Sequence, residues 1–120
     1  MFSNKNSKQK SEALRKILDR KGIISMPGCF DALSAKLIER EGIEVGFMSG
    51  FSVSSTKLGM PDTGLISFAE MLEQVKNISN ATNIPFIFDG DTGYGNSVNV
   101  YRTVRGYANA GAAGVMIEDQ

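Results

Sequence analysis

Apolar residues follow two recurring patterns along the chain. Short apolar runs, typical of strands buried in a parallel sheet, alternate with longer segments whose apolar residues return at helical spacing. In chain order we predict a helix over 11–20, a strand over 23–26, a helix over 31–41, a strand over 45–48, a helix over 67–80, a strand over 84–88, a helix over 97–110 and a strand over 113–117. Strands that alternate with helices in this way indicate an α/β fold with a parallel sheet and right-handed crossovers.

Residue types at the helix ends support these boundaries. Asp31 and Ser67 are suited to accept hydrogen bonds from the first free N–H groups of a helix, and Glu70 completes a capping box with Ser67. The second helix is expected to place Leu33, Leu37 and Ile38 on one face. Residues 51–66, rich in Ser, Gly and Thr, are predicted to form a long loop.

The spacing of the βα units indicates part of a barrel. The units repeat at about thirty residues, which is the spacing of a TIM (β/α)8 barrel of about 250 residues. We therefore expect residues 11–120 to form the N-terminal half of such a barrel, strands 1–4, preceded by a short N-terminal helix. Residues 1–10 are polar and are expected to form a disordered tail. An open four-stranded sheet is the structural alternative.

Composition and charge exclude several classes of function. The chain carries 13 basic and 13 acidic residues, so its formal net charge is zero, and we expect no nucleic-acid or anionic membrane partner. No stretch approaches the roughly 20 apolar residues of a membrane span, and the start of the chain lacks the apolar core of a signal peptide. A cytoplasmic location is expected.

Cysteine and histidine usage restricts the chemistry further. Cys29 is the sole cysteine and histidine is absent, so an internal disulfide, a cysteine-based zinc site and a Ser-His-Asp triad cannot be built. Cys29 follows Pro-Gly ahead of a helix; a small buried residue is the expected role, and a reactive thiol is the alternative. Chemistry is therefore expected to rest on carboxylates, lysines, hydroxyls and backbone groups.

Polar residues gather where the predicted strands end. They are Asp31 after the first strand, Ser49 and Gly50 after the second, Asp89 and Asp91 after the third, and Glu118 after the fourth. Ligands bind at this edge in barrels and open α/β sheets alike. The opposite strand ends carry no comparable cluster, and this asymmetry predicts a functional site at the carboxyl edge.

The run Asp89-Gly90-Asp91-Thr92-Gly93 is the sharpest candidate. Its two carboxylates would point the same way if the strand persists through them. Close carboxylates repel unless a cation lies between them, and Mg²⁺ takes oxygen ligands while keeping several waters. Glu118 could supply a third group, directly or through water. The spacing alone leaves open that Asp91-Thr92-Gly93 is only a turn before the next helix.

Two other segments have weaker signals. Leu58-Gly59-Met60-Pro61-Asp62 is either an ordinary turn or a mobile loop that brings Asp62 to the site. The Ser49-Gly50 pair could offer backbone N–H groups to an anionic substrate.

Taken in order, these motifs resemble the isocitrate lyase and phosphoenolpyruvate mutase superfamily over residues 11–120. The matching segments are Pro27-Gly28, 31–35, Ser49-Gly50, 58–62, 89–96, Asn99-Val100, 110–112 and 117–120. The chain is most similar to the lyase-like members, which include 2-methylisocitrate lyase, oxaloacetate-hydrolysing enzymes and carboxyphosphonoenolpyruvate mutase.

The resemblance implies a barrel with a Mg²⁺ site, with Mn²⁺ as an alternative ion. Asp89 resembles the direct metal ligand, and Asp91 and Glu118 resemble the groups that hold the metal's waters. Asp62 resembles a loop carboxylate near the metal, so Asp62 and Glu118 are the candidate catalytic residues.

The resemblance also implies a small carboxylate substrate. Ser49, Gly50 and Phe51 resemble the segment that binds the substrate carboxylate through hydroxyl and backbone groups. The implied function is a Mg²⁺-dependent lyase that cleaves a C–C bond of a 2-hydroxy polycarboxylate or α-keto acid, such as 2-methylisocitrate or oxaloacetate, through an enolate intermediate. A phosphonomutase of the same superfamily and a non-catalytic half-barrel are the alternatives.

One departure from the superfamily's pattern is large. Lyase members carry a lysine- and cysteine-containing segment just after the fourth strand, and this chain ends before it. We therefore expect the isolated chain to be an inactive fragment of a homo-oligomeric parent enzyme.

Overall fold

A four-stranded parallel sheet of order β1-β2-β3-β4 forms the centre of the computed structural model, which describes residues 6–120. The strands are β1 (Gly28–Cys29), β2 (Gly46–Met48), β3 (Phe86–Asp89) and β4 (Gly114–Met116). The helices are α1 (Ser7–Leu18), α2 (Ala32–Arg40), α3 (Gly50–Leu58), α4 (Phe68–Ala81) and α5 (Ser97–Asn109). The α/β fold, the parallel sheet and the N-terminal helix predicted from the sequence are confirmed.

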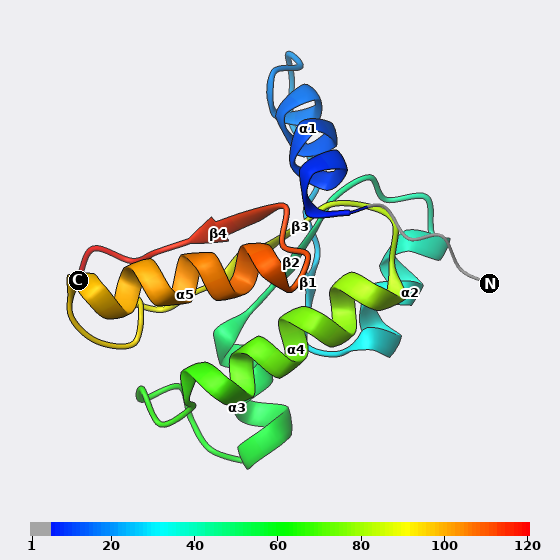
Figure 1. Ribbon diagram of the computed structural model, residues 1–120. Coiled ribbons are helices and arrows are strands. Elements are labelled where there is room, and N and C mark those ends of the chain that lie inside the picture. The colour runs from blue at the N-terminus through cyan, green and yellow to red at the C-terminus, as the bar shows by residue number, and fades with distance from the viewer. Residues whose placement is uncertain (1–5) are drawn as a thin grey trace.

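Helices cover one face of the sheet, and the strand register determines which side chains they bury. α2 packs against α4 and α4 against α5, so the three form a layer on the sheet (Figure 1). Met48 lies opposite Phe88, and Phe88 opposite Val115, on the face toward this layer. Phe88 is 1% exposed in a core that also contains Tyr107 of α5. Because side chains alternate along a strand, Asp89 belongs to the opposite face.

α1 covers the ends at which the strands begin. Leu14 and Ile17 pack with Val45, which precedes β2, and with the partly buried Ile87 and Ala113. α1 and α3 accordingly lie at opposite ends of the sheet (Figure 1). The carboxyl edge, where the polar residues were predicted to gather, is therefore the edge that α1 leaves accessible.

The disordered tail predicted for residues 1–10 is wrong over its described part. Residues 1–5 lie outside the described residues, but Asn6 is the N-cap of α1 and forms a capping box with Gln9. Lys10 is 2% exposed, and its Nζ donates to the carbonyls of Ser79 and Thr82 at 2.6 and 2.8 Å. The start of this helix was missed because the residues that stabilise it, the capping pair and the buried Lys10, are polar, and a polar composition is typical of disordered segments.

The first strand also lies later than predicted. Ile23, in the predicted strand 23–26, is fully exposed, and strand pairing begins only after Pro27. The Pro27 carbonyl accepts a hydrogen bond from the Phe47 N–H at 3.0 Å, which aligns β1 with β2. The prediction therefore placed the strand on the apolar run 23–26, whereas the residues that pair with β2 are Gly28 and Cys29.

The loop predicted for 51–66 contains a helix, α3. Ser49 caps its start by accepting from the Ser52 N–H, and Gly59 ends it in the left-handed conformation with φ 62°. Ser and Thr have low helix propensity, but these caps and the burial of Val53 and Ser54 override it. Only residues 59–67 connect α3 to α4 without regular structure.

The apolar face expected on α2 is only partly buried. Ala35 and Ile38 pack into the core, whereas Leu33 and Leu37 are 67% and 52% exposed. α4 keeps the predicted capping box, in which the Ser67 N–H donates to Glu70 at 2.8 Å.

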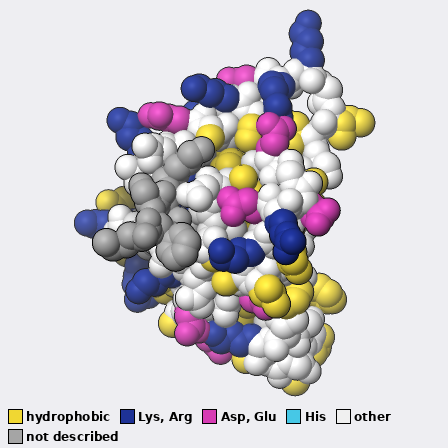
Figure 2. All heavy atoms as spheres, turned by 90° about the vertical axis from the view of Figure 1, so that its right-hand side faces the viewer, with side chains coloured by type: hydrophobic (Ala, Val, Ile, Leu, Met, Phe, Trp, Pro, Cys, Tyr) yellow, Lys and Arg dark blue, Asp and Glu magenta, His cyan; other side chains and the backbone are white. Residues whose placement is uncertain are grey.

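The visible surface carries charges of both signs. In Figure 2, Lys and Arg side chains are interspersed with Asp and Glu on the face shown, rather than gathered into a patch of one sign. Within residues 6–120, no helix combines the length and the apolar character needed to cross a membrane.

Replacing Lys10 should destabilise the fold although the residue belongs to a polar segment. In Lys10→Met the carbonyls of Ser79 and Thr82 lose a buried, charged donor, which should cost about 1–3 kcal/mol of unfolding free energy. Urea denaturation of this variant and of Lys8→Met, an exposed lysine of the same helix, provides the measurement. Equal stabilities of the two variants would contradict a stabilising role for the hydrogen bonds of Lys10.

The buried thiol of Cys29 should make stability fall at high pH. Burial, with a smaller contribution from Asp31, raises the pKa of Cys29 from 9.0 to about 12. Between these values the unfolded chain loses the proton and the folded chain keeps it, so unfolding becomes easier as pH rises from 9 to 12. The reactive-thiol alternative is thereby disfavoured. Denaturation across this range should show a shallower decline for Cys29→Ala than for the original chain, and parallel declines would refute the assignment.

Candidate functional site

The carboxylate of Asp89 is the most precisely held group at the carboxyl edge. Asp89 is the last residue of β3, and its Oδ2 accepts from the Gly50 N–H at 2.9 Å while its Oδ1 accepts from the Asp91 N–H at 2.9 Å. One donor comes from the start of α3 and the other from the loop that follows β3. Two backbone donors therefore fix the positions of both oxygens.

Gly50 approaches this carboxylate too closely for a side chain. A Cβ at position 50 would lie 2.8 Å from Asp89 Oδ2 and 3.2 Å from its Cγ. The parallel register brings Gly50 and Asp89 together, because Met48 of β2 lies opposite Phe88 of β3. The segments that follow Met48 and Phe88 therefore leave the sheet at the same level. The sequence predicted Gly50 as a binding residue, and the structure gives it a direct role in orienting Asp89.

Asp91 and Glu118 are linked through their backbones. Asp91 adopts φ 50°, uncommon for a residue other than glycine, and its carbonyl accepts from the Glu118 N–H at 2.8 Å. The Asp91 Oδ1 accepts from the Thr92 N–H at 2.7 Å, and the Glu118 carboxylate accepts from the Gln120 side chain. The predicted turn over 91–93 is therefore present, and it carries Asp91 beside the end of β4.

Four carboxylates line one pocket of about 360 Å³ at this edge. The lining residues are Gly50, Asp62, Thr63, Gly64, Ile66, Asp89, Asp91, Tyr94, Glu118 and Gln120. This lining includes no Lys or Arg, so its acidic residues have no cationic side chain on the pocket wall. Their field reaches Tyr94, whose pKa is raised to about 12, mainly by burial and further by Asp89, Asp91 and Asp62.

The donor set of the pocket fits a hard divalent cation. Carboxylate oxygens are the ligands that Mg²⁺ prefers, and the uncompensated charge would attract it. Among residues 6–120, however, no three Asp, Glu, Cys or His side chains converge closely enough to ligate one ion together. Mg²⁺ keeps several waters, so one direct carboxylate with others acting through water remains compatible with this arrangement. The ligand roles of Asp89, Asp91 and Glu118 stay a prediction.

Of the remaining predicted site residues, Asp62 lines the pocket and Ser49 and Phe51 do not. Asp62 lies on the pocket wall, in the connection between α3 and α4. Ser49 and Phe51 flank Gly50 but are outside the pocket lining; Ser49 caps α3, and Phe51 is 60% exposed.

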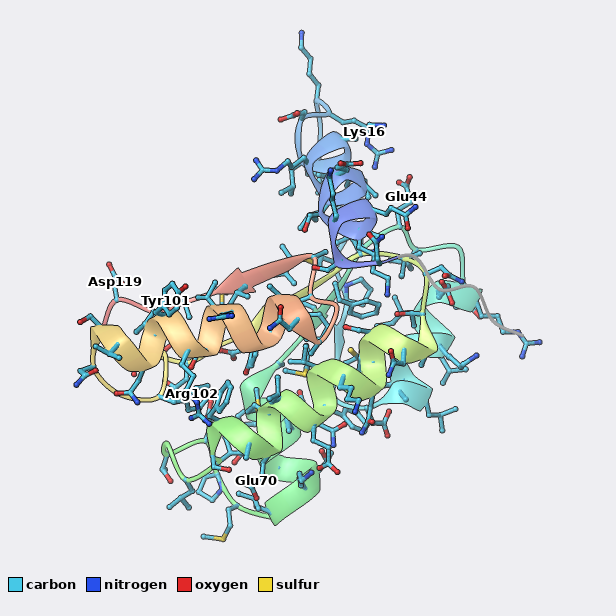
Figure 3. All side chains as sticks on the ribbon, viewed as in Figure 1. Lys16, Glu44, Glu70, Tyr101, Arg102 and Asp119 are labelled. Carbon is cyan, nitrogen blue, oxygen red and sulfur yellow. The ribbon has the colours of Figure 1, made fainter. Side chains whose placement is uncertain are left out.

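Tyr94 is a site residue that the sequence analysis did not identify. It follows Gly93 inside the predicted motif and adopts φ 60°, and its ring packs 6.0 Å from that of Phe68. Arg102 of α5 lies over the Phe68 ring, with its Cζ 4.6 Å from the ring centre. Figure 3 shows the position of Arg102 on this helix. The available signal was an aromatic residue between two glycines, directly after the run that carries Asp89 and Asp91.

Comparisons with known proteins identify the family of the chain. A family model described as phosphoenolpyruvate phosphomutase matches residues 14–120. The chloroplastic carboxyvinyl-carboxyphosphonate phosphorylmutase of Arabidopsis thaliana is 45% identical over 106 residues, covering 88% of this chain and 31% of that protein. The 2,3-dimethylmalate lyase of Eubacterium barkeri is 44% identical over 107 residues, covering 89% and 37%.

A solved structure extends the comparison to the fold. Phosphonopyruvate hydrolase in complex with oxalate and Mg²⁺ superposes with a TM-score of 0.86 at 37% identity, over 92% of this chain and 39% of that one. The chain thus spans 31% and 37% of the length of the two curated relatives above. The chain belongs to the phosphoenolpyruvate phosphomutase family, within the PEP mutase/isocitrate lyase superfamily of lyases and mutases, and its four-stranded sheet is part of the TIM barrel of that superfamily.

Proposed function

We propose that this chain provides the metal-binding part of the active site of a Mg²⁺-dependent lyase. The enzyme would cleave a C–C bond of a 2-hydroxy polycarboxylate or an α-keto acid through an enolate. The observation that carries the proposal is the pocket lined by Asp62, Asp89, Asp91 and Glu118, in which Asp89 is fixed by two backbone donors.

Asp89 is suited to be the direct metal ligand, with Mn²⁺ as an alternative ion. Its two N–H partners set the direction of the carboxylate before any ion arrives, which reduces the reorganisation that binding requires. Asp91 and Glu118 would hold the metal's waters, and the hydrogen bond between their backbones keeps their main chains side by side. A bound Mg²⁺ would supply positive charge that stabilises the developing enolate oxygen.

Other residues in the pocket and beside it would act on the substrate. Ser49, Gly50 and Phe51 form the start of α3, where the helix dipole favours a substrate carboxylate. Asp62 and Glu118 are the carboxylates available to accept a proton from substrate or water. No Lys, Cys or His lines the pocket within the part of the chain that the structure describes, so we propose that the acid–base partner lies outside this chain.

The lyase proposal has a specific competitor. The Arabidopsis relative, named for a phosphorylmutase, is as similar to this chain as the dimethylmalate lyase is. A phosphonomutase, acting on a C–P bond, is therefore the second candidate. The two share the metal site that we propose and would differ in the groups facing the bond that breaks.

Several wider expectations belong to the same proposal. The substrate would be a small carboxylate, and neither nucleic acid nor a membrane would be a partner. The parent enzyme would be a homo-oligomer in the cytoplasm. The 120-residue chain alone would bind the metal without turning over substrate.

The metal site is tested by calorimetric titration of the chain with Mg²⁺ and by electron paramagnetic resonance with Mn²⁺. We expect Asp89→Asn to weaken binding at least about tenfold, because the direct ligand loses its charge. Asp19→Asn, at the exposed end of α1, is the matched control and should bind as the original chain does. If Asp89→Asn bound the ion as tightly as the control, Asp89 would not be the ligand.

Substrate class is tested with oxalate, 2-methylisocitrate, oxaloacetate and phosphonopyruvate. Oxalate accompanies Mg²⁺ in the solved phosphonopyruvate hydrolase, and its binding here should require Mg²⁺ and fail in Asp89→Asn. We expect no product from the isolated chain; robust turnover would overturn the claim that its acid–base group lies elsewhere. Tighter Mg²⁺-dependent binding of phosphonopyruvate than of 2-methylisocitrate and oxaloacetate would favour the phosphonomutase.

Gly50→Ala should damage the site without unfolding the chain. The added Cβ would lie 2.8 Å from Asp89 Oδ2 and force the carboxylate away from the Gly50 N–H. We expect a shifted ¹³C resonance for the Asp89 carboxyl carbon and weaker Mg²⁺ binding. Gly28→Ala has open space for its Cβ and should change neither. An unmoved Asp89 resonance in Gly50→Ala would show that the close approach does not constrain the carboxylate.

A further inference from the structure

Two buried hydroxyl groups on α5 hold the backbone of the segment that carries Asp89 and Asp91. Thr103 Oγ1 donates to the Gly93 carbonyl at 2.9 Å, and the Tyr107 hydroxyl donates to the Asp89 carbonyl at 3.1 Å. Thr103 and Tyr107 are 2% and 0% exposed. Residues four apart lie on the same face of a helix, so one stripe of α5 contacts both ends of the segment 89–93.

The acceptors of these two hydrogen bonds lie outside α5. A threonine inside a helix commonly donates to a carbonyl of its own preceding turn, but Thr103 donates to a residue ten positions earlier in the chain. Tyr107 reaches back across eighteen positions to the last residue of β3. Both donors therefore hold the segment 89–93, which carries Asp89 and Asp91, rather than α5 itself.

The Tyr107 ring has little freedom to move. It stacks on Phe68 with ring centres 6.2 Å apart and meets Phe88 edge-on at 6.4 Å. The ring therefore presents its hydroxyl to the Asp89 carbonyl from a fixed position. The Tyr94 hydroxyl is buried beside the Tyr107 hydroxyl and interacts with it. The hydroxyl that donates to the Asp89 carbonyl is that of Tyr107.

We infer that Thr103 and Tyr107 are positioning residues for the acidic site. They fix the main chain at Gly93 and Asp89, and this fixes the direction in which the Asp89 carboxylate meets the Gly50 and Asp91 N–H groups. The inference deepens the proposed function, because a rigid Asp89 matters to the extent that it binds an ion. The positioning itself can be measured without the ion.

Two isosteric variants remove the hydroxyls one at a time. Tyr107→Phe and Thr103→Val keep the buried volume, and Thr103→Ser restores a hydroxyl at the same position. Tyr101→Phe is the control, since Tyr101 lies on the same helix, is 67% exposed, and leaves α5 in a different direction from Arg102 (Figure 3). Thr103→Val tests the inference independently if Tyr107→Phe does not fold.

Amide hydrogen exchange in metal-free chain is the first measurement. The N–H groups of Gly50 and Asp91 donate to Asp89, so their exchange reports on its carboxylate. We expect exchange at these two amides to accelerate about tenfold in Tyr107→Phe and Thr103→Val, the size of one net hydrogen bond, with Thr103→Ser near the original rate. The Phe47 N–H, bonded to the Pro27 carbonyl, should keep its rate. Uniform acceleration at all three amides would mean a merely structural role and would overturn the inference.

Mg²⁺ titration of the same variants is the second measurement. The two variants that lack a hydroxyl should bind the ion about tenfold more weakly than Tyr101→Phe and Thr103→Ser. Unchanged affinity in folded variants would overturn the link between the hydroxyls and the site. If the original chain failed to bind Mg²⁺, the proposed function would fall, and the exchange rates at Gly50 and Asp91 would still decide whether Thr103 and Tyr107 position Asp89.

Discussion

The parallel register between β2 and β3 is the constraint on which the site depends. It places Met48 opposite Phe88, so the chain leaving β2 at Gly50 passes within hydrogen-bond distance of the residue that ends β3, Asp89. The burial of Phe88 against the helical layer holds that register, because a slip of one residue would turn Phe88 outward and Asp89 into the core. The hydrophobic packing of Phe88 on one face of the sheet thus determines where the carboxylate of Asp89 lies on the other face.

The sequence predicted those elements whose boundaries rest on local chemistry. α4 begins at the predicted capping box of Ser67 and Glu70, and the acidic residues after β3 share one pocket. α3 was missed because its stability comes from tertiary burial of Val53 and from end caps, while its composition is typical of loops. β1 was misplaced because an apolar run does not reveal which of its neighbours will find a pairing partner.

The groups that surround the carboxylates were harder to predict than the carboxylates. Asp89 stands at the end of a recognisable strand, but two of its hydrogen-bond partners, Gly50 and Tyr107, lie 39 and 18 positions away. No spacing rule links Gly50 or Tyr107 to Asp89, since their proximity is created by the crossovers of the βα units. Only the pairing of Thr103 and Tyr107 at helical spacing on a buried face could have suggested a polar stripe.

The contact between Gly50 and Asp89 also bears on how such a site could diversify. Any side chain at position 50 would occupy space already taken by the carboxylate, so evolution cannot adjust the pocket there without giving up the orientation of Asp89. Adaptation to new substrates would have to be carried by neighbouring positions that have room, such as the exposed Phe51 and the connection that bears Asp62. One fixed glycine would therefore separate the part of the active site that is inherited from the part that is free to vary.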